Sequence, residues 1–282
     1  MVLPIVVGIL LKALTAPPAE GIQITGARIF CRIPMPLQDL LITEAQINSW
    51  LVMISIFGLC LYLTHGLTTQ NISKRQHLAE WIVTTVEKLV TGNMGSYFKG
   101  FAPFITAILA LSAFSSLLSL VGLYPPTSDL NVVAGWAVLV FILITYYKSK
   151  CGPLQYMKSF AEPVPFLAPL NIISEVATPL SMAFRHYGNV LSGTVISVLI
   201  AAGLQGLSRL LLGWVPVLGE LSLLQIGLPA VLSVYFDVFS GCLQAYIFAM
   251  LTMMYVAGGF PLDLYLQRKR KKHKKQLSGG NV

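Results

Sequence analysis

The feature that most limits how this chain can fold is a pair of apolar stretches that are too long to cross a bilayer upright. Residues 169–201 as a helix would measure about 50 Å, against a hydrocarbon core of about 30 Å, and a second apolar stretch covers residues 221–260. Such helices must tilt, bend or break. Pro179 is a place to bend, because proline cannot donate a hydrogen bond to the carbonyl of Glu175. With 55% hydrophobic and 11% charged residues, the chain has the composition of a multi-pass membrane protein.

Three shorter apolar runs precede the long ones, at residues 47–66, 101–123 and 130–147. Each is about one bilayer thick. After the first run, residues 73–76 read Ser-Lys-Arg-Gln, the capping-box pattern that begins a helix. The apolar residues that follow share one face of a helix: Leu78, Trp81, Ile82, Val86, Leu89 and Val90. This pattern indicates a helix that lies in the membrane interface. We therefore expect an all-α integral membrane protein with about five crossing helices and one interfacial amphipathic helix, the last two crossing helices being long and steeply tilted.

The two ends of the chain differ from this single membrane domain of residues 47–262. Prolines and glycines in residues 1–46 predict an irregular lead-in rather than a folded domain, and a cleaved signal at residues 1–14 is an alternative that the missing basic start disfavours. The tail, residues 263–282, holds seven of the 19 Lys and Arg residues. Because the remainder is nearly neutral, we expect contact with anionic membrane lipid and no nucleic-acid partner.

The distribution of basic residues predicts the orientation in the membrane. With the amino terminus outside, 14 of the 19 Lys and Arg residues fall in cytoplasmic segments, and the outer segments carry only Lys12, Arg28, Arg32 and Arg209. The positive-inside rule therefore predicts a multi-pass protein of the cell membrane with an outer amino terminus and a cytoplasmic carboxyl terminus.

Arg185 is the residue in the first long stretch that most needs an explanation. A guanidinium stays protonated, and its insertion at the centre of a membrane helix costs about 2.5–3.5 kcal/mol. At helical spacing Arg185 shares a face with Ser181, Asn189 and Ser192. Snorkelling of Arg185 to the interface is one interpretation. The polar neighbours, with nearby glycines that admit a close partner, favour a polar stripe instead.

The second long stretch carries its own polar stripe, at three- and four-residue steps: Ser233, Asp237, Ser240, Gly241 and Gln244. A carboxylate inside a membrane is a functional candidate by default. The simplest structural role for Asp237 is a buried salt bridge to Arg185. Because polar residues continue beyond both charges, we prefer a water-lined path.

The sequence contains no Walker loop, nucleophile elbow, metal box or dinucleotide fingerprint, and its four cysteines are isolated from one another. We expect no enzymatic activity of the chain alone, no cofactor and no metal. A fixed cation attracts a carboxylate but cannot relay a proton, so Arg185 predicts an electrostatic gate between two half-channels, with the mobile carboxylate on a partner. The alternative is a stand-alone secondary transporter that binds an anionic substrate at Arg185, although no internal repeat supports it.

Four segments resemble subunit a of F-type ATP synthases, in the same order: residues 125–132, 169–175, 184–189 and 243–252. The resemblance covers roughly residues 45–262. It implies a stator subunit of the Fo sector that holds two tilted helices against a rotating ring of c subunits. Two offset half-channels would pass protons, or Na⁺, to and from the ring carboxylates, with the b-subunit stalk and indirectly the F1 sector as further partners and no nucleotide site in this chain.

The resemblance also implies roles for individual residues. Arg185 matches the family's essential arginine, with His186 beside it as a packing residue. The outer half-channel would include Asn189, Asp237 and Gln244.

The inner half-channel is expected near Glu175 and Ser181. Many bacterial relatives have a glutamate where this chain has Thr194 and a histidine where it has Asp237. We therefore expect Asp237 alone to supply the ionisable step of the outer path, with Thr194 at most hydrogen-bonding water beside it.

Overall fold

The computed structural model describes residues 2–15, 26–36, 39–68, 73–150, 152–160, 165–212, 227–262 and 265–267. The basic tail from residue 268 and residues 213–226, between the two long helices, lie outside these residues. The main elements follow one another as α1 (Val2–Thr15), β1 (Ile29–Ile33), β2 (Leu40–Thr43), α2 (Glu44–Thr64), α3 (Lys74–Met94), α4 (Ala102–Leu117), α5 (Leu130–Ser149), α6 (Pro153–Phe160), α7 (Ala168–Leu212), α9 (Leu228–Ser233), the π-helical segment η6 (Val234–Ser240) and α10 (Gly241–Gly259). Short 3₁₀ turns, among them η1 (Ser96–Phe101), η2 (Leu118–Val121) and η3 (Pro126–Ser128), connect some of them.

Within the described residues, five helical stretches are long and apolar enough to cross a membrane, at Glu44–Thr64, Ser96–Val121, Leu130–Ser149, Pro165–Ser208 and Val231–Gly259. The expected class, an all-α membrane protein of about five spans, is confirmed. The helix α3 is not among these stretches, as expected for an interfacial helix.

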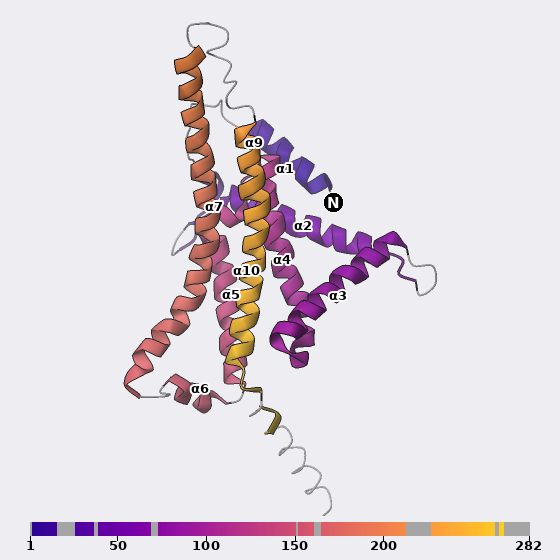
Figure 1. Ribbon diagram of the computed structural model, residues 1–282, viewed down its shortest axis with the longest axis vertical. Coiled ribbons are helices and arrows are strands. Elements are labelled where there is room, and N and C mark those ends of the chain that lie inside the picture. Colours follow the sequence, from indigo (N-terminus) through magenta and orange to yellow (C-terminus); the bar gives the residue numbers. More distant parts are fainter. Residues whose placement is uncertain are drawn as a thin grey trace, which may run out of the picture.

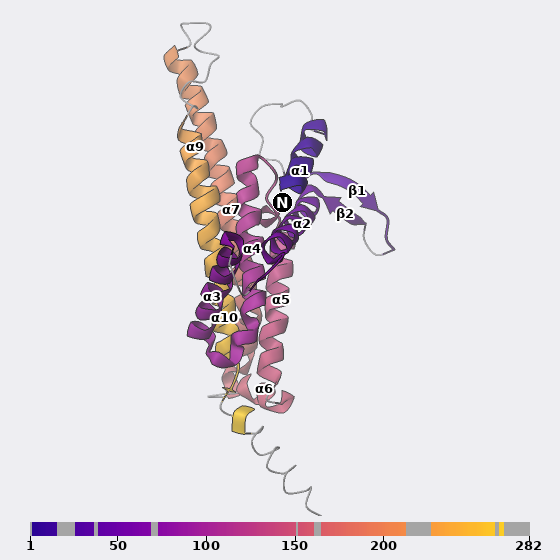
Figure 2. The same cartoon turned by 90° about the vertical axis from the view of Figure 1, so that its right-hand side faces the viewer.

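Four of the stretches form a bundle (Figure 1). The helices α4, α5, α7 and α9–α10 run along the long axis of the molecule, and α2 and α3 project to one side. Figure 2 shows α7 and α9–α10 extending together beyond the rest of the bundle. The largest buried cluster lies where α10 packs against α3, α4 and α5, and its fully buried members include Val90, Ile105, Val140, Phe248 and Met253.

The helix α7 is longer than expected. It has 45 residues, which at 1.5 Å per residue is about 67 Å. The first long apolar stretch was counted to residue 201, but the helix continues past Gly203 through residues 203–212. An isolated glycine costs a helix only about 1 kcal/mol, so the apolar flanks and the packing against α9 outweigh it. The amino-terminal part of α7 bends away from the rest (Figure 1), and Pro179 inside the helix explains a bend.

The lead-in is more regular than its prolines and glycines indicated, because it contains α1 and an antiparallel hairpin of β1 and β2. Gly26 precedes the first strand, and Pro34 and Pro36 fall between the strands, so these residues interrupt no element. The helix α1 lies against α2, where a Cβ on Gly8 would come within 2.9 Å of Leu51.

The start of α3 follows half of the predicted capping box. The Ser73 hydroxyl accepts a hydrogen bond from the Gln76 backbone at 3.3 Å. The Gln76 side chain, however, binds both backbone groups of Thr68 instead of returning to Ser73. The predicted apolar face divides: Val86 and Val90 are buried in the bundle, and Trp81 is 61% exposed on the projecting part, where a membrane interface suits it.

Candidate functional site

Two polar regions flank Arg185 on the long helices. The first, which we call the Asp237 cluster, lies where α7 meets η6. The Asn189 amide donates to the Ser240 hydroxyl at 2.8 Å, and the same hydroxyl donates back to the Asn189 oxygen at 3.1 Å. This reciprocal pair joins the two long helices near the midpoint of α7.

Asp237 lies beside this pair, with the Ser119 hydroxyl next to its carboxyl group. Ser116, Ser119, Asn189 and Asp237 line a small cavity of about 10 Å³, close to the least space that holds one water molecule. The other lining residues are Val190, Gly193, Phe236 and Gly241, so one part of the cavity wall is polar and the rest is apolar. The cavity therefore suits a single hydrated step rather than a wide channel.

Two close contacts allow the helices to meet here. A Cβ on Gly193 would lie 3.0 Å from the Phe236 ring, and a Cβ on Gly241 would lie 2.6 Å from the Ser116 Cβ. The π-helical segment places Asp237 between these two contacts. Such segments insert an extra residue into a helix and occur frequently at functional sites.

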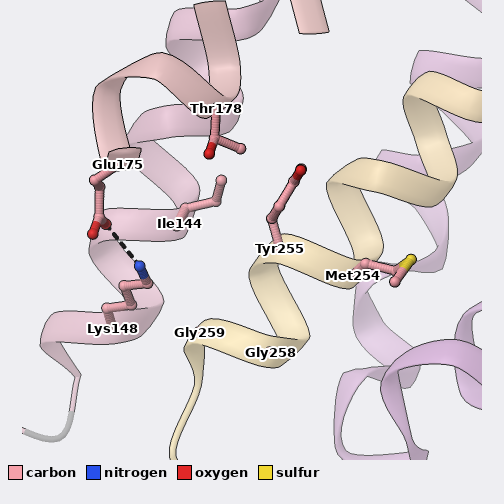
Figure 3. A pocket seen from close by; sticks show the side chains of 8 residues that line it. All are labelled: Ile144, Lys148, Glu175, Thr178, Met254, Tyr255, Gly258 and Gly259. Atoms are coloured by element: carbon pink, nitrogen blue, oxygen red, sulfur yellow. Dashed lines mark hydrogen bonds and ion pairs between the residues drawn. The ribbon is translucent and has the colours of Figure 1, made fainter. Parts of the chain in front are cut away.

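The second region, the Glu175 cleft, lies between α5, α7 and α10 toward their other ends (Figure 3). It has a volume of about 210 Å³ and is lined by Ile144, Lys148, Glu175, Thr178, Met254, Tyr255, Gly258 and Gly259. Lys148 donates to Glu175 at 2.9 Å, and the side chains are 28% and 10% exposed. The cleft thus contains a carboxylate that is largely withdrawn from solvent and held by a cation.

Tyr156 of α6 donates its hydroxyl to the same Glu175 oxygen at 3.2 Å. Burial, and then the negative charge of Glu175, raise the pKa of this phenol above its usual value. Tyr156 therefore stays protonated and remains a donor at all ordinary pH values. Neither Lys148 nor Tyr156 was expected in the site, because each reaches Glu175 from another helix.

Arg185 lies between the two regions and is exposed on the surface of α7. Among the described residues, neither an ion pair nor a hydrogen bond involves its guanidinium, so the predicted alternative of a buried salt bridge to Asp237 is wrong. Snorkelling from a helix end is also disfavoured, because Arg185 lies 17 residues after the start of α7 and 27 before its end.

The remaining predicted site residues, Ser181, Thr194 and Gln244, differ in their exposure and hydrogen bonding. Ser181 is exposed on the face of Arg185. Thr194 is exposed too, but its hydroxyl donates to the Val190 carbonyl of its own helix at 3.0 Å. Gln244 is 5% exposed and follows Gly241 by three residues, so it faces the same side of α10.

No group of three or more metal-binding side chains occurs in the part of the chain that the structure describes. The arrangement suits charge movement: a carboxylate beside a water-sized cavity, a carboxylate in a cleft, and a fixed cation between them that no described acidic side chain pairs with.

Comparison with known proteins places this arrangement in a family. A family model described as "ATP synthase A chain" matches residues 46–257. The chain is 32% identical over 223 residues to the ATP synthase subunit a of Bacillus pumilus strain SAFR-032, covering 73% of this chain and 89% of the relative. It is 31% identical over 226 residues to that of Bacillus subtilis strain 168, with the same coverage. The ATP synthase subunit a of Legionella pneumophila strain Corby is 29% identical over 222 residues, 77% of this chain and 86% of the relative.

Proposed function

The chain belongs to the ATP synthase A chain family, and from this premise we propose that it is the stator subunit of the Fo sector of a rotary ATP synthase. In this function it catalyses no reaction of its own. It forms two offset aqueous half-channels that pass protons, or Na⁺, to and from the carboxylates of a ring of c subunits. A b-subunit stalk joins it, indirectly, to the F1 sector.

The observation that carries this proposal is the exposed Arg185 in the middle of α7, whose guanidinium has no ion-pair or hydrogen-bond partner among the described residues. Leaving a guanidinium without a countercharge inside a membrane costs several kcal/mol. A carboxylate on a facing subunit removes that cost, and an ion-carrying ring supplies one such group after another. Arg185 is therefore the gate: it attracts each deprotonated ring carboxylate and excludes cations from passing directly between the half-channels.

The polar regions on either side of Arg185 support two separate entrances. Along α7, Asn189 lies about 6 Å beyond Arg185 and Glu175 about 15 Å before it, at 1.5 Å per residue. We assign the outer half-channel to the Asp237 cluster with Gln244. We assign the inner half-channel to the Glu175 cleft, with Ser181 on the way to Arg185. Thr194 lies beside the outer path, where it at most hydrogen-bonds water.

The same proposal includes the arrangement in the cell membrane. Residues 47–262 form one membrane domain, residues 1–46 lie outside the cell, and the basic tail, residues 263–282, lies in the cytoplasm against anionic lipid. The basic residues at the end of α5 and in the tail support this orientation.

Replacing the gate tests the proposal. We expect Arg185→Ala to abolish ATP-driven uptake of protons or Na⁺ into inverted membrane vesicles, because the charge that separates the half-channels is lost. Passive leak through vesicles stripped of F1 should persist or increase. Arg75→Ala, which removes an exposed arginine from α3, is the matched control and should pump normally. Normal pumping by Arg185→Ala would overturn the proposal.

A second experiment tests the outer path. We expect Asp237→Asn to reduce pumping at least tenfold, because the amide fits the cavity but cannot ionise. Asp129→Asn is the control: Asp129 caps α5 through the Asn131 backbone at 2.9 Å, and asparagine caps equally well. Unimpaired pumping in Asp237→Asn would remove Asp237 from the path while leaving the gate untouched.

A further inference from the structure

The residue next to the gate points in the opposite direction. His186 is fully buried (0% exposed), whereas Arg185 is exposed. Successive residues of an α-helix are about 100° apart. Any rotation of α7 that moves His186 therefore moves Arg185 by the same angle, so whatever fixes the ring also fixes the direction of the guanidinium.

Three neighbouring helices hold the His186 ring. Its Nε2 lies 3.3 Å from the Ser112 hydroxyl of α4, at hydrogen-bond distance. Its edges meet the Trp136 ring of α5 and the Phe248 ring of α10, with centroids 6.0 and 5.8 Å away and interplanar angles of 75° and 85°. The hydrogen bond is the only one of these three contacts with a strong directional preference, because edge contacts between rings tolerate sliding.

Stability alone does not explain a histidine at this position. The Nδ1 atom is buried without a hydrogen-bond partner among the described residues. An unpaired buried polar atom is unfavourable, and an apolar side chain of similar size would avoid that cost. What leucine could not provide is the bond to Ser112.

We propose that His186 is a positioning residue: its hydrogen bond to Ser112 sets the rotation of α7 at which Arg185 faces out of the bundle. This inference rests on the gate role proposed for Arg185. It assigns to His186 no proton transfer and no contact with the transported ion.

The test compares His186→Leu, which removes the hydrogen bond and keeps the apolar contacts, with His186→Gln, which keeps a polar nitrogen close to the position of Nε2. Three quantities are measured in inverted vesicles: the amount of assembled complex, ATP-driven pumping, and passive ion leak after F1 is removed. We expect His186→Leu to assemble normally or better, to pump roughly tenfold more slowly per complex, and to leak more, because a small misplacement of a positioned group is costly. His186→Gln should recover most of the pumping.

The ratio of leak to pumping separates positioning from packing. A purely structural defect lowers assembly, pumping and leak together and leaves this ratio unchanged, which would overturn the inference. Normal pumping by His186→Leu would do the same.

The partner residue provides an independent check. Ser112→Ala should reproduce the higher ratio of leak to pumping, and combining it with His186→Leu should add nothing further. Ser115→Ala, which removes a hydroxyl from the same helix, is the control and should behave as the unmodified protein. Additive effects of Ser112→Ala and His186→Leu would show that the hydrogen bond is not what positions α7.

Failure of the positioning role of His186 can be distinguished from failure of the proposed function. If Arg185→Ala pumps normally, the gate itself is wrong. If Arg185→Ala is inactive and His186→Leu is unaffected, only the positioning role is wrong.

Discussion

At the scale of single residues, the environment of Glu175 shows how a carboxylate is kept within a membrane protein. Lys148 and Tyr156 both contact one oxygen of Glu175, at 2.9 and 3.2 Å. A partly buried charge without partners would be strongly unfavourable. The two donors allow the carboxylate to remain in the cleft, although its side chain is only 10% exposed.

The Lys148–Glu175 pair leads to a prediction about stability. Lys148→Met leaves the Glu175 carboxylate, whose side chain is only 10% exposed, without its cation. We expect the free energy of unfolding to fall by about 1–2 kcal/mol. This loss is smaller than for a fully buried ion pair, because both side chains keep some contact with solvent. The measurement is the unfolding midpoint of the purified protein in detergent.

Lys99→Met is the matched control. Lys99 pairs with Glu87 at 3.2 Å, but these side chains are 64% and 35% exposed, so its loss should change the unfolding midpoint little. The double variant Lys148→Met/Glu175→Gln should regain most of the lost stability. Equal effects of Lys148→Met and Lys99→Met would contradict the partial burial of the Glu175 pair.

The sequence alone identifies charged residues that are unfavourable inside a membrane, but it does not identify the side chains that contact them in the fold. Arg185 and Asp237 are conspicuous because charges are rare in apolar helices. Asn189 was predicted in the outer path, and the structure joins it to Ser240. Ser119 and Lys148 could not be assigned, because a serine or a lysine near a helix end is ordinary until folding brings a second helix beside it.

At the scale of elements, the π-helical segment is what sequence patterns could not predict. The apolar run predicts a helix through residues 234–240, and nothing in it distinguishes a π from an α segment. The distortion follows from tertiary contact, since η6 packs against α4, α7 and η2 at the same time. The existence of a helix depends on local composition and can be predicted from the sequence. The π-helical widening of η6 depends on the helices packed against it and cannot be predicted in this way.

Close approach of α4 to the second long helix leads to a prediction at Gly241. Its missing Cβ would lie 2.6 Å from the Ser116 Cβ, so Gly241→Ala must push the two helices apart. Overpacking of this kind costs about 1–3 kcal/mol, and we expect a lower unfolding midpoint together with slower pumping.

Gly135→Ala is the control for Gly241→Ala. Gly135 lies in α5, and no atom would come within 4 Å of an added Cβ. Alanine should therefore raise helix stability slightly, by up to about 1 kcal/mol. A stabilising Gly241→Ala would mean that α4 and α10 do not approach as closely as the structure places them.

At the scale of the whole molecule, one long helix connects both polar regions. The Asp237 cluster and the Glu175 cleft lie along α7 on opposite sides of Arg185, and the cavities of these two regions share no lining residue. The number of spans was predicted from hydropathy. The offset between the two regions was not, because it depends on which face of α7 meets α5 and which meets η6.

The orientation of the whole chain gives the last prediction. Cys31 is exposed on the hairpin before the first span, and Cys151 follows the third. With the amino terminus outside, a membrane-impermeant maleimide should label Cys31 in right-side-out vesicles and Cys151 in inverted vesicles. Cys60 and Cys242, exposed on membrane-spanning helices, should react in neither, because lipid covers them. Single-cysteine variants make each signal separate, and labelling of Cys31 only in inverted vesicles would reverse the assignment of inner and outer half-channels.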